Sequence, residues 1–237
     1  MLLILAGEGA SDLGMTSNHG HRPGPMAVIV DAIISEVLGF SPLAVDRVQW
    51  VSRARLSEIS KSRLTRPTLV IPGPRREAGY AMHAKHAAAL SWVAMEAENA
   101  EQDVAIAVMF RDSDGTQTSS GQNWNLLVKA IKSGFEAMTF YRGVAMVPKP
   151  KQEAWLLCAL KQDPYQHCAA LEEESGNDSS PNSLKRQLAA VCDGEPAVET
   201  MCDWIRDHKI DIKRIDMPSF RYFLESLSTA LTKAAGH

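Results

Sequence analysis

The fold is decided by residues 105–115, which read Ala-Ile-Ala-Val-Met-Phe-Arg-Asp-Ser-Asp-Gly. Six consecutive apolar residues that end in polar turn residues are typical of a strand buried on both faces. In open α/β sheets, functional sites form at the C-terminal ends of such strands. The stretch therefore predicts a parallel sheet that carries Asp112 and Asp114 at one edge.

The N-terminus repeats this arrangement with one acid, because the apolar residues 2–6 lead directly into Gly7 and Glu8. Carboxylates that converge repel one another, so at neutral pH such a cluster needs raised pKa values or a bound cation. Hard oxygen ligands favour Mg²⁺ or Mn²⁺ over zinc. The alternative is that residues 112–115 form only a turn that caps a helix beginning near Gln122.

Helices and strands alternate along the first 150 residues. Helical periodicity predicts helices over 26–38, 80–99 and 122–138, and apolar runs predict further strands at 67–72 and 141–147. This order indicates a Rossmann-like parallel sheet with helices on both faces. The segment 14–25 is rich in glycine, histidine and proline and is expected to be a loop.

From Gln152 onward the pattern is mostly helical. A polar segment around 172–183 interrupts it, and its composition predicts a loop with a tendency to disorder. We therefore expect an α/β core over 1–150 and a C-terminal helical extension over 151–237 that packs on the core.

Length and composition set limits on the class of protein. The chain has 237 residues, of which 45% are hydrophobic, enough for a large core. No apolar run is long enough for a membrane span, and residues 1–6 lack the flanks of a signal peptide. Four cysteines lie far apart with no Cys-x-x-Cys, which argues against a zinc ribbon and a disulfide framework. These features predict a protein of the reducing cytoplasm.

Charge is distributed unevenly. Between Arg47 and Arg76 there are eight basic residues and one acidic residue, so this segment carries +7 although the whole chain carries -3. A basic segment beside an acidic metal cluster suits a phosphodiester substrate. The alternative is a solvated surface around a loop and an edge strand. The residues expected to bind nucleic acid are Arg53, Arg55, Arg63, Arg66, Arg75 and Arg76.

A third candidate acid is Glu153, which falls in the first turn of the helix expected after the last strand. That position places it at the same edge as Glu8 and Asp112. Glutamate is also favoured near helix N-termini by the helix dipole alone, so a structural role remains open. His83 and His86 share one face of the helix over 80–99 and are expected at the boundary of core and solvent.

The order of these motifs resembles the Toprim domain of topoisomerases, DnaG-type primases and OLD-type nucleases. It is more similar still to Toprim-like families of unknown function that are found with ATPases in bacterial phage-defence and restriction loci. The motifs that carry the resemblance are Gly-Glu-Gly (7–9), Asp-Ser-Asp (112–114), Pro-Lys-Gln-Glu-Ala-Trp-Leu (150–156), Pro-Asn-Ser-Leu-Lys (181–185) and Met-Pro-Ser-Phe-Arg-Tyr-Phe (217–223).

The resemblance implies a metal-dependent nuclease, or a related phosphodiester-cleaving enzyme, that works with an ATPase partner in genome defence. It implies Glu8 as general acid/base or metal ligand, Asp112 and Asp114 as Mg²⁺ ligands, and Glu153 as a further ligand or water-positioning group. One alternative is a non-catalytic Toprim-like subunit that binds nucleic acid or a nucleotide and regulates its partner. Another is a phosphatase on a different doubly wound sheet, but phosphatases of the haloacid-dehalogenase type carry their aspartate pair after the first strand.

Overall fold

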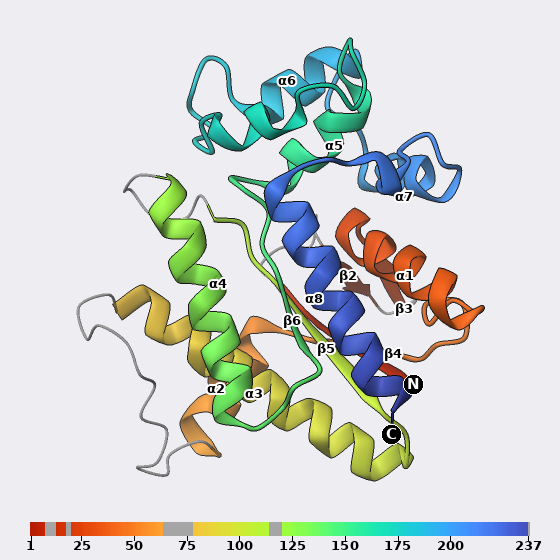
Figure 1. Ribbon diagram of the computed structural model, residues 1–237, viewed down its shortest axis with the longest axis vertical. Helices are drawn as coiled ribbons and strands as arrows, with labels where there is room; N and C mark the ends of the chain where they lie inside the picture. The colour runs from red at the N-terminus through yellow and green to blue at the C-terminus, as the bar shows by residue number, and fades with distance from the viewer. Residues whose placement is uncertain (8–12, 18–19, 64–77, 114–119, 237) are drawn as a thin grey trace.

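A computed structural model describes residues 1–7, 13–17, 20–63, 78–113 and 120–236 (Figure 1). Its central sheet has four parallel strands in the order β4-β1-β5-β6. The strands are β1 (Leu2–Ala6), β4 (Val48–Val51), β5 (Ala105–Phe110) and β6 (Gly143–Met146). A parallel α/β sheet is thus confirmed.

Helices cover both faces of this sheet (Figure 1). The α-helices are α1 (Pro25–Leu38), α2 (Arg53–Ser62), α3 (Ala78–Glu101), α4 (Ser120–Ala137), α5 (Gln152–Leu160), α6 (Leu184–Val191), α7 (Val198–Arg206) and α8 (Pro218–Ala235). Two short 3-10 helices, η1 (Cys168–Glu173) and η2 (Ile212–Arg214), lie between them.

The alternation of side chains along β1 explains why both faces need a cover. Leu3 and Leu5 join one buried cluster with α1, α5 and α8, whereas Leu2, Ile4 and Ala6 join a second with α2, α3 and α4. Full burial of a leucine or isoleucine side chain contributes about 1.5–3 kcal/mol. An apolar strand of this kind is therefore stable only between two helical layers.

The C-terminal extension shares its core with the sheet, because α8 runs along the same face as α1 (Figure 1). The indole Nε1 of Trp155 donates to Ser219 Oγ at 2.9 Å, and Phe220 packs edge-on against the Trp155 ring. The α8 N-terminus is thereby tied to α5. The structure describes residues 172–183 throughout, and the first two of them belong to η1.

Buried Glu172 anchors that polar segment. Its Oε1 accepts the backbone N–H of Ser219 at 2.7 Å, in the first turn of α8, whose own N-cap residue makes no side-chain cap. Two ion pairs add to the contact: Lys149 with Glu173 at 2.7 Å and Lys151 with Asp178 at 2.9 Å. A carboxylate that satisfies a free helix N–H holds the segment in place despite its polar composition.

One local prediction is wrong, and one strand was not predicted. The segment 14–25, expected to be a loop, contains the antiparallel hairpin β2 (Gly14–Ser17) and β3 (Gly20–Pro23). The strand beside β1 is β4, which the sequence pattern does not predict because it is short, partly exposed and contains Gln49. The predicted strand at 67–72 lies outside the described residues.

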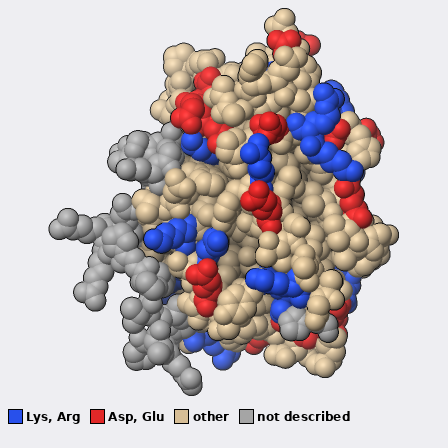
Figure 2. All heavy atoms as spheres, in the orientation of Figure 1, with Lys and Arg blue, Asp and Glu red and all other residues tan. Residues whose placement is uncertain are grey.

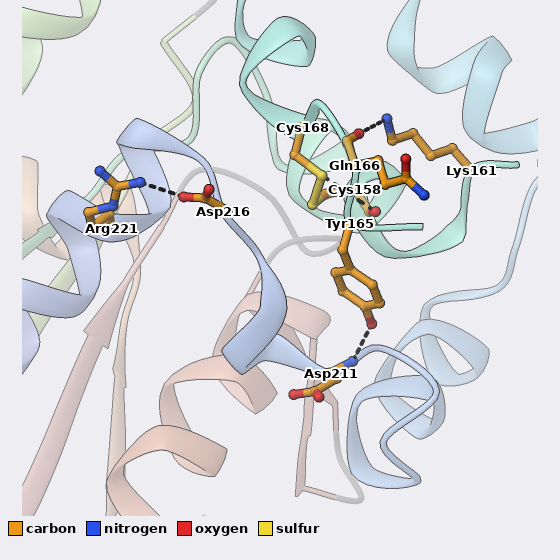
Figure 3. Close-up of a disulfide and its surroundings, with 8 residues drawn as sticks. All are labelled: Cys158, Lys161, Tyr165, Gln166, Cys168, Asp211, Asp216 and Arg221. Atoms are coloured by element: carbon orange, nitrogen blue, oxygen red, sulfur yellow. Dashed lines mark hydrogen bonds and ion pairs between the residues drawn. A yellow bond between two sulfur atoms is a disulfide. The ribbon is translucent and has the colours of Figure 1, made fainter. Parts of the chain in front are cut away.

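The cysteine spacing argues against a disulfide framework, but Cys158 and Cys168 form one disulfide, with their Cα atoms 5.2 Å apart (Figure 3). The chain reverses direction after α5, and the Tyr165 N–H donates to Cys158 O at 2.7 Å across this turn. The reversal brings Cys168 back beside the end of α5. The Tyr165 hydroxyl accepts the N–H of Asp211 at 2.8 Å (Figure 3). This turn, rather than sequence spacing, brings the sulfurs together, and the cysteines no longer argue for a reducing compartment.

None of the helices in the described part of the chain combines the length and the apolar character that crossing a bilayer requires.

Close packing of α3 against α4 generates a prediction at Gly134. A Cβ added to Gly134 would lie 2.1 Å from the carbonyl oxygen of Ala84. Helix propensity alone would make Gly134→Ala stabilising by about 1 kcal/mol. We expect the opposite sign, a loss of about 1–3 kcal/mol in the free energy of unfolding, because the helices must separate. Urea unfolding measures it, with the exposed-site variant Glu136→Ala as control. A more stable Gly134→Ala protein would contradict the packing.

Candidate functional site

Asp112 joins the end of β5 to the beginning of α5. Its Oδ1 accepts the backbone N–H of Gln152 at 3.1 Å. The N-cap residue of α5, Lys151, makes no side-chain cap, so Asp112 satisfies a free helix N–H from a neighbouring element. Glu153 is the next residue of the same turn. The structure thus places two of the predicted acids, Asp112 and Glu153, at the same edge of the sheet, Asp112 at the end of β5 and Glu153 in the first turn of α5.

Ser113 fixes the backbone around this contact. Its N–H donates to Pro150 O at 3.0 Å, and its buried hydroxyl reaches Pro148 O at 3.0 Å. The Arg111 N–H donates to Met146 O at 3.1 Å. The residues after β5 are therefore bonded to the connection between β6 and α5, which leaves Asp112 little positional freedom.

Glu8 and Asp114, the other two predicted acids, lie outside the described residues. β1 pairs with β5 in parallel, with Ala6 opposite Met109, so these two strands end at one edge of the sheet. Within the described ranges, no group of three or more His, Cys, Asp or Glu residues could hold a metal ion. Asp112 and Glu153 alone represent the predicted cluster there.

Lysines surround this edge. Lys149 and Lys151 flank Pro150 and are mostly buried, each paired with an acid of the polar segment. The pKa of Lys185 is raised, first by its ion pair with Glu195 and further by the charges of Asp178 and Glu153. Positive charge therefore acts on Glu153 from α6.

Strand alternation sends Arg111 to the opposite face from Asp112. Ala105, Ala107 and Met109 face the layer of α2, α3 and α4, and Arg111 continues that series. Its side chain is fully buried and acts electrostatically on His83 and His86 of α3. The two residues that follow β5 therefore lie in different environments: Arg111 near the histidines of α3, and Asp112 at the start of α5.

His83 and His86 both have a pKa lowered to about 4, first by burial and then by the charge of Arg111. Arg53 of α2 acts in the same direction on both rings. His83 is partly exposed, but His86 is only 2% exposed, so its expected place at the boundary of core and solvent is wrong. The association of Arg111 with these histidines was not predicted from the sequence, although an arginine directly after six apolar residues is a signal of a buried charge.

The basic segment is described in part. Arg53, Arg55 and Arg63 are exposed on α2 or at its end, whereas Arg66, Arg75 and Arg76 lie outside the described residues. Arg55 pairs with Glu58 at 2.9 Å, and the Arg63 guanidinium lies 5.4 Å from the centre of the Trp92 ring. On the face that carries α4 and α8, basic and acidic side chains are interspersed (Figure 2). Of these two described surfaces, α2 is thus a better candidate for contact with a phosphate backbone than the face that carries α4 and α8.

The lowered histidine pKa values predict a stability that depends on pH. The folded pKa of about 4 is below the unfolded value of 6.5, so between these limits the unfolded chain binds more protons. Stability is therefore lost as the pH falls from about 6.5 to about 4. We expect His83→Gln/His86→Gln to lose less stability over this range than wild type, measured as the urea midpoint near pH 7 and near pH 4.5. Equal losses would remove these rings as the cause.

No protein-family model matches this chain, and neither does any curated protein or solved structure.

Proposed function

We propose that this protein is a metal-dependent nuclease, or a related phosphodiester-cleaving enzyme, of the Toprim-like type. The observation that supports it most is the hydrogen bond from the Gln152 N–H to Asp112, which places Asp112 at the start of α5, beside Glu153 in sequence, at the C-terminal edge of a parallel sheet. Open α/β sheets place their ligand sites at this edge.

The donor set suits Mg²⁺ or Mn²⁺. Asp112 and Glu153 offer only carboxylate oxygens, and Mg²⁺ in proteins is commonly held by one or two carboxylates together with substrate phosphates. Asp112 Oδ1 accepts the Gln152 N–H, and an ionised carboxylate has about four acceptor sites, so capping and metal ligation are compatible. We propose Glu8, Asp112, Asp114 and Glu153 as the ligand set. Once bound, the cation would supply an activated water and neutralise charge on the phosphate.

The protein's own part is positioning. The bond of Asp112 to the start of α5 and the bond of Ser113 to Pro148 in the preceding connection hold the carboxylate before substrate arrives, which reduces the reorganisation needed during reaction. Glu8 is proposed as general acid/base. Arg53, Arg55 and Arg63, together with Arg66, Arg75 and Arg76, are proposed to hold the phosphate backbone of the substrate.

The proposed substrate is nucleic acid, DNA or RNA, and the proposed setting is the cytoplasm. An ATPase partner and a role in phage defence belong to the proposal through the resemblance of the motifs to families found with ATPases in defence loci. An ATPase of that kind would load or expose the substrate strand.

A specific observation favours a second function, a non-catalytic subunit that binds nucleic acid or a nucleotide and regulates its partner. Asp112 already has a structural role as the cap of α5. A carboxylate kept for capping alone would leave the fold intact without any chemistry at this edge.

Metal binding separates the two functions. Asn accepts the same backbone N–H, so Asp112→Asn keeps the cap while removing the charge. We expect Mg²⁺ or Mn²⁺ to raise the melting temperature of wild type, because a cation at a hundredfold excess over its Kd adds about 2.7 kcal/mol to the free energy of unfolding. The melting temperature of Asp112→Asn/Asp114→Asn should not change. The exposed-site variant Asp163→Asn should respond like wild type. Equal responses in all three proteins would remove Asp112 and Asp114 from the metal site.

Cleavage itself is the second test. With Mn²⁺ present, Asp112→Asn should abolish cleavage of DNA or RNA, because loss of a principal ligand costs several kcal/mol of transition-state stabilisation, on the order of a thousandfold in rate or more. Each assay is run with and without a neighbouring ATPase and ATP, and Asp163→Asn is the control. If wild type and Asp112→Asn behave alike under all these conditions, the regulatory function takes precedence.

A further inference from the structure

A polar cluster with no part in the proposed metal site lies between α2, α3 and the end of β5. We define the imidazole cluster as Arg53, Ser57, His83, His86 and Arg111. Arg53 and Ser57 are one turn apart on α2, and both contact α3: Arg53 Nη2 lies 3.9 Å from Met82 Sδ, and Ser57 Oγ lies 3.1 Å from His86 Nε2. Three elements thus converge on two imidazole rings.

The rings have hydrogen-bonding capacity that the described residues leave unused. The Nδ1 atoms of His83 and His86 are buried and have no hydrogen-bond partner among the residues that the structure describes. A buried polar atom without a partner costs about 1–3 kcal/mol. Two such atoms in one cluster indicate a role beyond packing, because buried polar groups are nearly always paired.

Charge decides which kind of ligand this capacity suits. Within the described chain, the charged groups that act on both rings are Arg53 and Arg111, both cations. A metal cation would be repelled here although His-x-x-His is a familiar ligand spacing, whereas an anion would be attracted. Their lowered pKa keeps the rings neutral near pH 7, and a neutral imidazole still donates one N–H.

We propose that the imidazole cluster binds a phosphate group of the nucleic-acid substrate. Ser57 Oγ lies 3.1 Å from His86 Nε2. In the tautomer that the proposal requires, the Ser57 hydroxyl donates to Nε2 and the Nδ1–H of His86 donates to a phosphate oxygen, while the Arg53 guanidinium supplies the charge. This inference rests on the proposed function for the identity of the substrate. Because Asp112 directly follows Arg111, the bound phosphate would be a neighbour of the one that is cleaved, and the cluster would position the strand.

Inorganic phosphate without divalent metal is the probe, so that this test is independent of the metal site. At equal ionic strength, phosphate should raise the melting temperature of wild type more than chloride does. It should also shift the imidazole ¹⁵N signals of His83 and His86. Arg53→Ala should weaken the phosphate Kd by about tenfold to a hundredfold, the range of a charge-assisted hydrogen bond. Lys61→Ala is the matched control, since it removes one exposed cation from the same helix and should keep the wild-type Kd.

The inference is overturned if phosphate acts no differently from chloride, or if Arg53→Ala and wild type share one Kd. Arg53 is exposed, so this variant is expected to fold even where substitution of buried His86 disrupts the core. Asp112→Asn should bind phosphate normally. Phosphate binding at the cluster together with no metal binding at Asp112 would refute the proposed nuclease and leave the anion site standing.

Discussion

The hydrogen bond from the Gln152 N–H to the Asp112 carboxylate is the contact on which the candidate site depends. The first N–H groups of a helix have no partner within the helix, and an anion placed there satisfies them and complements the helix dipole. For α5 that anion comes from the end of β5, so this bond ties the end of the strand to the start of the C-terminal extension. It also fixes Glu153 one residue further on.

The same solution recurs at α8, where buried Glu172 accepts the N–H of Ser219. The neighbouring pairs of Glu173 and Asp178 with lysines involve exposed carboxylates, and such pairs contribute only about 0–1 kcal/mol. The buried cap is therefore the stronger anchor of the polar segment. Two of the helices in the extension begin at carboxylates supplied by other elements: Asp112 ties α5 to the sheet, and Glu172 ties α8 to η1 within the extension.

Charge of opposite sign is sorted to the two faces at the end of β5. Successive residues of an extended chain point to opposite sides, so Arg111 faces the histidines of α3 while Asp112 faces α5. A cationic group and an anionic group can thus lie within one residue of each other without neutralising each other. For the proposed nuclease, this separation suits one side for the cation with the cleaved phosphate and the other side for a neighbouring phosphate of the strand.

The sequence by itself determined the strands β1, β5 and β6 and the helices α1, α3 and α4, because apolar runs and helical periodicity are local signals. It also determined that Asp112 and Glu153 share an edge, since parallel strands bring their C-terminal ends together. Tertiary structure alone decided the strand β4, the hairpin β2–β3, the Cys158–Cys168 disulfide and the convergence of Arg53, His86 and Arg111. Each of these depends on where the chain returns to in space, and residues that meet only after a reversal or a crossover leave no periodic signal in the sequence.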